Sequence, residues 1–295
     1  MKKYFKLLRV EQWVKNLFVF VPLFFSGNIQ NIDLLSKSIF AFIIFSLAAS
    51  VVYILNDYND IEADRKHPEK RRRPLASGAV SKSQAIAIFV GLIVADIALV
   101  FFAQIYFQKS LWKFATIIGS YFVMNLAYTF RLKHVPIIDI SIIALGFVLR
   151  VLAGGYITGI SISQWAILLT FVLALVLAIG KRRGELINAQ VSGKTRRALD
   201  GYNVQFADIA LSISVTLAIV CYLMFTLSPE VQARFHQRVF YTVIFVVFAF
   251  LRYLQQTLVY NRTESPTKIV YRDRYIQATL LLWVAAFLIQ IYFKK

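Results

Sequence analysis

Residues 36–64 read SKSIFAFIIFSLAASVVYILNDYNDIEAD, a long apolar run that ends in a group of acidic residues. At roughly 1.5 Å per residue, a run of this length can cross a hydrocarbon layer of about 30 Å as a helix. Backbone groups in lipid must find their hydrogen bonds within their own segment, so a helix is expected. The stretch therefore predicts a membrane helix that carries polar chemistry at one end.

The composition of the whole chain supports the same class. Hydrophobic residues make up 59% of the 295 residues and charged residues only 16%, while the mean hydropathy is +0.64. A soluble domain of this size needs far more polar surface to cover one core. We therefore expect an all-α polytopic membrane protein, with residues 1–295 in a single integral-membrane domain. The single cysteine, Cys221, excludes a disulfide framework.

Nine apolar blocks of spanning length follow one another along the chain. The expected spans are 17–33, 36–55, 83–104, 111–130, 137–156, 164–180, 206–227, 239–257 and 276–293. The first is the weakest, because Pro22 and the stretch Ser26-Gly27-Asn28 shorten its apolar part.

Positive charges are distributed unequally between the two sides that nine spans define. The N-terminus and the loops after even-numbered spans hold 24 Lys and Arg residues, and the opposite side holds seven. This bias predicts a cytoplasmic N-terminus in the plasma (inner) membrane, with the basic loops on the cytoplasmic face. Topology thus explains the net charge of +18, so no nucleic-acid partner is expected. The basic face would instead attract anionic membrane lipids and phosphorylated substrates.

The acidic group lies at 56–64, on that basic side. Asp57, Asp60 and Asp64 stand at i, i+3 and i+7, so on a continuing helix they share one face with Asn56 beside them. Such an oxygen-rich group suits Mg²⁺, which takes a few carboxylates together with phosphate oxygens of the substrate. A bound metal would neutralise the charge that builds on a leaving diphosphate.

A solvated acidic helix end is the ordinary explanation for an arbitrary DxxD pattern. Here, however, the three aspartates belong to only 15 acidic residues in the chain, and the basic run 70–73 follows them. Carboxylates followed by cations at the end of a membrane helix favour a metal–diphosphate site.

The stretch Asn56-Asp57-x-x-Asp60-x-x-x-Asp64, followed by RPLASG at 73–78, resembles the first signature of the UbiA superfamily of intramembrane prenyltransferases. A later segment, Tyr128-Thr129-x-x-Leu132-Lys133 with Asp139, Gly146, Arg150 and Gly154, is also similar to that superfamily. The resemblance covers nearly the whole chain. It implies a UbiA-like bundle of nine transmembrane helices with metal-bound diphosphate.

The second signature departs from the common pattern, in which a further Asp-rich motif after the sixth span binds another Mg²⁺. This chain has the basic segment GKRRGEL at 180–186 and then Arg196-Arg197-Ala198-Leu199-Asp200-Gly201-Tyr202. Cations there suit direct contact with phosphate oxygens. With QWVKN at 12–16, this departure resembles the decaprenyl-phosphate phosphoribosyltransferase branch, which transfers 5-phosphoribose from phosphoribosyl diphosphate to a polyprenyl phosphate in cell-envelope biosynthesis.

The hypothesis assigns a role to each polar segment. Asp57, Asp60 and Asp64 are the expected catalytic residues, and with Asn56 they form the Mg²⁺ site. The expected substrate-binding residues are Lys15, Asn16, Tyr58, Arg73, Tyr128, Arg131, Lys133, Arg150, Lys181, Arg182, Glu185, Asp200 and Tyr202.

Some of these residues have a second interpretation. Lys15 can belong simply to the positive-inside pattern. Arg150 lies in the middle of a span, where an unpaired charge is costly, so Asp96, Asp139 or Asp208 could be its structural partner.

Two other functions remain open. A UbiA-type prenyltransferase would carry the diphosphate on a prenyl donor and attack its allylic carbon with an aromatic acceptor. A membrane transporter is the alternative of another class, although it would distribute ionisable residues along a path through the spans. The sequence leaves homo-oligomerisation open.

Overall fold

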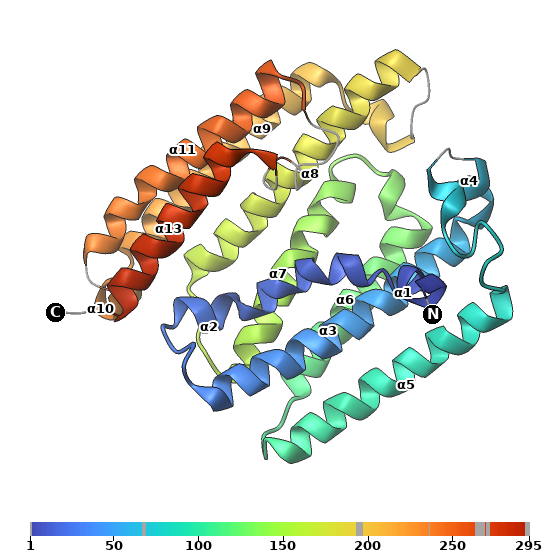
Figure 1. Ribbon diagram of the computed structural model, residues 1–295, viewed down its shortest axis with the longest axis horizontal. Coiled ribbons are helices and arrows are strands. Elements are labelled where there is room, and N and C mark those ends of the chain that lie inside the picture. The colour runs from blue at the N-terminus through green and yellow to red at the C-terminus, as the bar shows by residue number, and fades with distance from the viewer. Residues whose placement is uncertain are drawn as a thin grey trace. The chain divides into compact units, whose positions relative to one another are not determined.

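The structure is a computed structural model that describes residues 2–66, 69–192, 197–235, 237–262, 269 and 272–292. Every regular element in these residues is a helix, so the expected all-α class is confirmed (Figure 1). The chain divides into two compact units. Unit 1 holds Met1–Lys133 with Leu149–Ser161, and unit 2 holds His134–Val148 with Ile162–Lys295.

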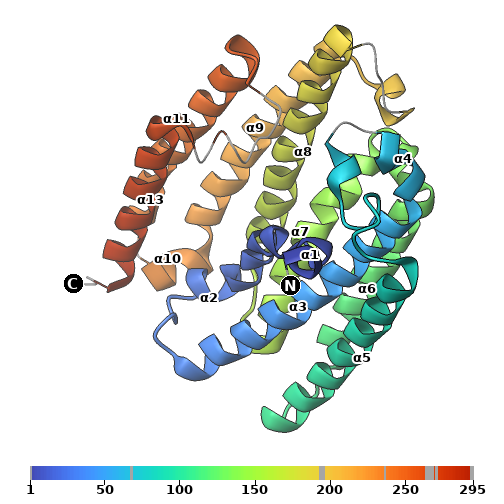
Figure 2. The ribbon, with the colours of Figure 1, turned by 45° about the vertical axis from the view of Figure 1, so that its right-hand side comes forward.

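Unit 1 is built around helix α3, whose N-cap Asn31 accepts a hydrogen bond from the Leu34 amide. Helices α5 and α6 both pack against α3, as the two views show (Figures 1 and 2). The elements of this unit are α1 (Lys2–Leu8), η1 (Val10–Phe20), α2 (Val21–Phe25), α3 (Ile32–Asn59), α4 (Ile61–Lys66), η2 (Lys70–Arg72), α5 (Lys82–Tyr106), α6 (Trp112–Phe130), most of η3 (Leu132–His134) and the second half of α7 (Ile138–Thr158).

Two apolar clusters hold unit 1 together. The larger joins Phe45 of α3 to Phe114 of α6 and Ile157 of α7. The smaller lies under the acidic end of α3, where Ile54, Ile61 and Leu75 are buried together. The second cluster matters for the site, because it packs the loop after α4 back onto the end of α3.

Unit 2 pairs α8 with α9 and α11 with α13. Its core includes Val176 of α8, Leu211 of α9 and Ile276 of α13. The elements are the first half of α7, α8 (Gln164–Ser192), η4 (Arg197–Gly201), α9 (Val204–Leu227), α10 (Pro229–Phe235), η5 (Gln237–Thr242), α11 (Val243–Leu254), η6 (Gln255–Val259) and α13 (Arg274–Tyr292).

Six helices of the described residues are long and apolar enough to cross a membrane, which supports an integral membrane protein. They match the expected spans 36–55, 83–104, 137–156, 164–180, 206–227 and 239–257. The expected spans 111–130 and 276–293 correspond to α6 and α13, and the latter is apolar over a shorter length. The count of nine is therefore not confirmed.

The expected span 17–33 is not one helix. It contains the end of the 3₁₀ helix η1, the five-residue helix α2, and a turn before α3 begins at Ile32. Pro22 lies in the first turn of α2, where a residue without a backbone N–H is tolerated. The helical run ends after Phe25, and Gly27 has φ 73°, outside the helical region. The turn that contains Gly27 explains why the apolar stretch does not form a single span.

Gly154 of α7 allows η1 to approach closely. A Cβ built on Gly154 would lie 1.9 Å from the carbonyl oxygen of Val19 and 2.9 Å from its carbonyl carbon. The contact is with backbone, which cannot move aside as a flexible side chain does. This close approach explains why a glycine stands at position 154 of the second UbiA-like segment.

We expect Gly154→Ala to destabilise the protein by about 1–3 kcal/mol, because the added methyl group must push η1 away from α7. Thermal unfolding in detergent measures the change. Gly91→Ala is the matched control, since nothing lies within 4 Å of its Cβ position on α5; removing a helical glycine there should be neutral or stabilising. Equal melting temperatures for the two variants would contradict the assigned contact.

Candidate active site

Two buried carboxylates share one arginine at the end of α3. Arg73 Nη1 donates to Asp57 Oδ1 at 3.2 Å and to Asp64 Oδ2 at 2.6 Å. Arg9 also donates to Asp57 Oδ1. Asp57 and Asp64 are only 2% and 3% exposed, so removing these cations would leave buried carboxylates without a counter-charge.

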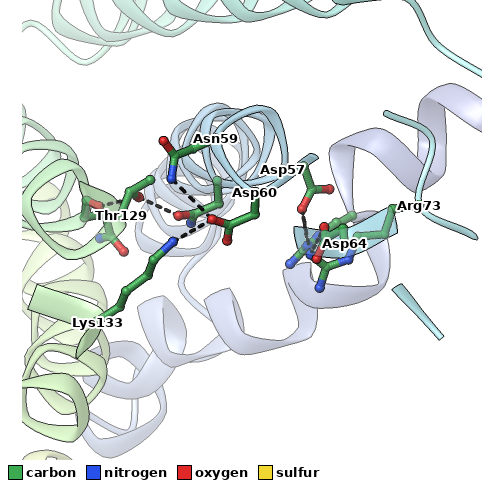
Figure 3. Close-up of polar contacts among 10 residues, drawn as sticks. Asp57, Asn59, Asp60, Asp64, Arg73, Thr129 and Lys133 are labelled. Carbon is green, nitrogen blue, oxygen red and sulfur yellow. Dashed lines mark hydrogen bonds and ion pairs between the residues drawn. The ribbon is translucent and has the colours of Figure 1, made fainter. Parts of the chain in front are cut away.

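Asp60 points to a different set of partners. Its Oδ1 accepts a hydrogen bond from Lys133 Nζ at 2.6 Å and one from Asn59 at 3.2 Å. Figure 3 shows Asp60 facing Lys133 while Asp57 and Asp64 lie beside Arg73. The helix is interrupted at Asp60, which caps α3 before α4 begins at Ile61.

This interruption changes the expected geometry. No group of three His, Cys, Asp or Glu side chains that could hold a metal ion occurs within the described parts of the chain. The predicted convergence of Asp57, Asp60 and Asp64 on one cation is therefore not seen. Instead, protein cations neutralise the carboxylates in two separate sets.

The residues nevertheless fit a divalent metal in one respect. Asp57 Oδ2 is buried and has no hydrogen-bond partner among the described residues, so it is an unused oxygen ligand in a place where such an atom is costly. Asn56 adds an amide oxygen, which accepts a hydrogen bond from Thr129. Carboxylate and amide oxygens are the ligands that hard cations such as Mg²⁺ take.

The remaining expected residues of this region surround the acidic group to different extents. Tyr58 is 38% exposed and has Lys82 Nζ 6.0 Å from its ring centroid. Tyr128 is half-buried near the end of α6, and Arg131 is exposed just after it. Lys15 is half-buried on η1.

Asn16 and Arg150 bind each other. Arg150 Nε donates to Asn16 Oδ1 at 2.7 Å, and Arg150 is also 3.3 Å from the hydroxyl of Tyr121. The guanidinium carbon lies 4.8 Å from the ring centroid of Phe45. Asn16 is fully buried and Arg150 is 5% exposed, so their described contacts hold η1 and α7 together.

The aspartates considered as partners for Arg150 lie elsewhere. Asp139 binds Arg182, and Asp208 binds Arg183. Asp96 lines an apolar cavity. The structure thus compensates the buried Arg150 with an amide, a hydroxyl and aromatic rings.

Unit 2 carries a second polar cluster, around Arg182. Its Nε donates to Asp139 Oδ2 at 2.7 Å, and its Nη1 donates to Glu185 Oε2 at 2.5 Å. Arg182 and Asp139 are 2% and 0% exposed. Glu185 is partly exposed, and Lys181 Nζ lies 3.9 Å from Glu185 Oε1.

Tyr202 completes this cluster from the loop after η4. Its hydroxyl donates to Asp139 Oδ1 at 2.7 Å and accepts from the amide of Ile137 at 2.6 Å. Burial and the hydrogen bond to Asp139 raise the pKa of Tyr202 to about 12, so the phenol is protonated at neutral pH. Ile137 has φ 67°, an unusual conformation for a β-branched residue. Asp200 is exposed on η4.

Two residues of the site were not expected from the sequence. Arg9 belongs to a basic N-terminal segment, where positive-inside topology already explains a cation. Thr129 stands in the second UbiA-like segment but carries no charge that would mark it. Arg9 and Asp57 are 48 residues apart in the chain, and only folding brings them together.

Comparisons with known proteins point to one family. Residues 17–283 match the model of the UbiA prenyltransferase family. The chain is 34% identical to the decaprenyl-phosphate phosphoribosyltransferase of Mycolicibacterium smegmatis, across 98% of this chain and 92% of that one. It is 33% identical to the enzyme of the same name from Corynebacterium glutamicum, across 97% and 86%.

Solved structures share the fold at lower identity. A UbiA homologue from Archaeoglobus fulgidus bound to GPP and Mg²⁺ matches with a TM-score of 0.68 and 18% identity, over 98% of this chain and 99% of that one. A structure described as digeranylgeranylglyceryl phosphate synthase matches with a TM-score of 0.68 and 19% identity, over 99% of both chains. The expected UbiA fold is therefore confirmed.

We expect Tyr202→Phe to reduce stability by about 1–3 kcal/mol, because buried Asp139 loses a hydrogen-bond donor. Thermal unfolding in detergent gives the shift in midpoint. Tyr241→Phe is the control, since Tyr241 is 72% exposed and should tolerate loss of its hydroxyl. If Tyr202→Phe melted with the wild type, the anchoring role of its hydroxyl would be wrong.

Proposed function

The chain belongs to the UbiA prenyltransferase family and is a transferase; from this premise we propose that it moves 5-phosphoribose from phosphoribosyl diphosphate to a polyprenyl (decaprenyl-type) phosphate. The bond from the anomeric carbon to the diphosphate oxygen breaks, and a bond from that carbon to the lipid phosphate oxygen forms. Diphosphate leaves. The observation that carries this proposal is the similarity of nearly the whole chain to enzymes named decaprenyl-phosphate phosphoribosyltransferase.

The acidic end of α3 binds the diphosphate in this proposal. Asn56, Asp57, Asp60 and Asp64 would hold Mg²⁺, and the metal would supply positive charge to the departing diphosphate. Support comes from the unused oxygen of buried Asp57. Arg73 lies beside these carboxylates, and its guanidinium would also contact phosphate oxygens of the diphosphate.

Lys133 has an analogous role at Asp60. Its ammonium group already lies within hydrogen-bond distance of that carboxylate, at the edge of the acidic group. A diphosphate oxygen can replace the carboxylate as its partner, because both are anionic acceptors. The site would thus offer the cationic side chains of Arg73 and Lys133 to the diphosphate, and carboxylates to the metal.

The cluster in unit 2 binds the ribose 5-phosphate. Arg182 is held in a defined orientation by Asp139 and Glu185, while exposed Lys181 and Asp200 would contact the donor phosphate and the ribose hydroxyls. Tyr202 fixes the cluster through Asp139. Preorganised cations of this kind bind phosphate with little loss of side-chain entropy.

The acceptor phosphate is the nucleophile. Lys15, Tyr58, Tyr128 and Arg131 contact its headgroup, and buried Asn16 and Arg150 support the helices that carry these residues. A phosphate monoester is largely ionised near neutral pH, so the reaction needs no strong general base. The lipid tail remains in the bilayer.

We further propose that residues 1–295 form a single integral-membrane domain in the plasma membrane, with the active site on the cytoplasmic face. The support for this orientation is the excess of Lys and Arg on one side of the expected spans. Phosphoribosyl diphosphate is water-soluble, and this orientation would give it access to the site from the cytoplasm.

The family leaves one serious alternative, transfer of a prenyl group from its diphosphate to an aromatic acceptor. The basic segment 180–186, which lies within α8, favours a hydrophilic phosphorylated donor instead. A transporter would require ionisable residues along a path, and family membership favours a transferase.

Substrate choice can be tested with purified protein, polyprenyl phosphate and labelled phosphoribosyl diphosphate. We expect a labelled lipid in the presence of Mg²⁺ and none after EDTA, because the diphosphate leaving group then lacks its counter-charge. Recovery on adding Mg²⁺ back excludes irreversible damage. Product from prenyl diphosphate and an aromatic acid would support the alternative, and ion flux in vesicles without turnover would support transport.

Asp60→Asn should lower turnover by about 100-fold or more, since it removes one anionic ligand without changing side-chain size. The labelled-lipid assay measures the rate, and expression level and melting temperature show that folding is intact. Asp33→Asn is the control: Asp33 is an exposed aspartate of the first turn of α3 that pairs with Lys37. Equal activity of the two variants would contradict the role of Asp60.

A further inference from the structure

An apolar cavity of about 450 Å³ lies between α3, α5 and α6 of unit 1. Its size falls within the range of small-molecule sites, roughly 300–1,000 Å³. Aromatic side chains of Phe101, Trp112 and Phe122 contribute to its wall. Phe101 and Trp112 are both 63% exposed, so in a membrane this side of the cavity faces lipid.

One carboxylate interrupts the apolar lining. Asp96 of α5 is only 8% exposed, and its Oδ1 has no hydrogen-bond partner among the described residues. Asp96 lies about 21 Å along α5 from Lys82 and about 15 Å from Tyr106, at a rise of roughly 1.5 Å per residue. It is therefore near the middle of the span, where an uncompensated acidic group is costly and indicates a functional role.

The shape of the cavity restricts what can satisfy Asp96. Ile93 and Gln104 of α5 both line it. Gln104 lies eleven positions after Ile93, which corresponds to about 16 Å along the helix axis. Asp96 lies toward one end of this length, and Gln104 and Trp112 lie toward the other. An elongated apolar molecule with a polar group at one end fits this pattern of lining.

We propose that the cavity binds a membrane-soluble hydrocarbon chain carrying one hydrogen-bond-donating head, a hydroxyl or an ammonium group, with the head at Asp96. The head satisfies the buried carboxylate, and the chain extends along α5 toward Trp112. This site is separate from the acidic group at the end of α3, and none of the residues assigned to transfer lines it.

Trp112 provides a readout of this orientation. Bromododecanol and bromododecylamine with bromine on the terminal carbon would place the bromine near Trp112 only when the head reaches Asp96. The protein is reconstituted in lipid nanodiscs, and bromine quenching of tryptophan fluorescence is measured. The part due to Trp112 is the difference in quenching between the wild type and Trp112→Phe. Bromododecane, which has no head group, is the reference probe.

We expect a headed probe to quench Trp112 at a concentration roughly five- to tenfold lower than bromododecane, in line with one added hydrogen bond. Asp96→Leu should abolish that difference. Asp96→Asn separates the two sources of the head: an alcohol keeps its advantage there, whereas an amine loses it with the charge. Equal quenching by all three probes in the wild type would overturn the proposal.

Occlusion of the cavity gives an independent check. Gly119 of α6 lines the cavity and has nothing within 4 Å of its Cβ position, so Gly119→Leu should fill the space and abolish the preference for headed probes. Gly91→Leu is the matched control, because Gly91 is equally open but does not line the cavity. If Gly119→Leu still preferred the headed probes, the cavity would not be their binding site. If Asp96→Leu lost the preference only together with a change in oligomer size, Asp96 would act in subunit contacts and not in binding this ligand.

Discussion

Arg73 lies between the carboxylates of Asp57 and Asp64, and the candidate site is arranged around this contact. Two buried carboxylates repel each other, and burial itself disfavours their charged forms. The guanidinium lies between the two negative charges, and Leu75, two residues later, packs with Ile54 and Ile61 to keep the loop in place. Apolar packing therefore positions the cation beside both carboxylates.

Buried charged groups also need partners in unit 2 and in the apolar cavity of unit 1. Arg182 and Asp139 are both almost fully buried, and removing Arg182 would leave the buried Asp139 carboxylate without its cation. Asp96 is the informative contrast, since its Oδ1 has no partner in the described chain. The paired charges belong to the proposed phosphate sites, and the unsatisfied oxygen of Asp96 is the basis of the proposed lipid site.

Much of the fold could be predicted because apolar length is a local property of the sequence. The expected span 17–33 was wrong because the helical run ends at Phe25, and a turn that contains Gly27 separates it from α3. The sequence marked this span as the weakest but did not determine where the chain turns. At the candidate site, the spacing of Asp57, Asp60 and Asp64 predicted one common face, and that expectation assumed a helix that continues past Asp60. In the structure α3 ends at Asn59, so Asp60 faces Lys133 while Asp57 and Asp64 face Arg73.

The sequence by itself determined the membrane class, the family and the location of the acidic and basic segments. Each of these depends on residues that are close together in the chain. Only the tertiary structure decided the partners, since Lys133 reaches Asp60 across 73 residues and Arg150 reaches Asn16 across 134. A buried charge takes whichever counter-group the packing of helices brings within a few ångströms, and that packing is not a local property of the sequence.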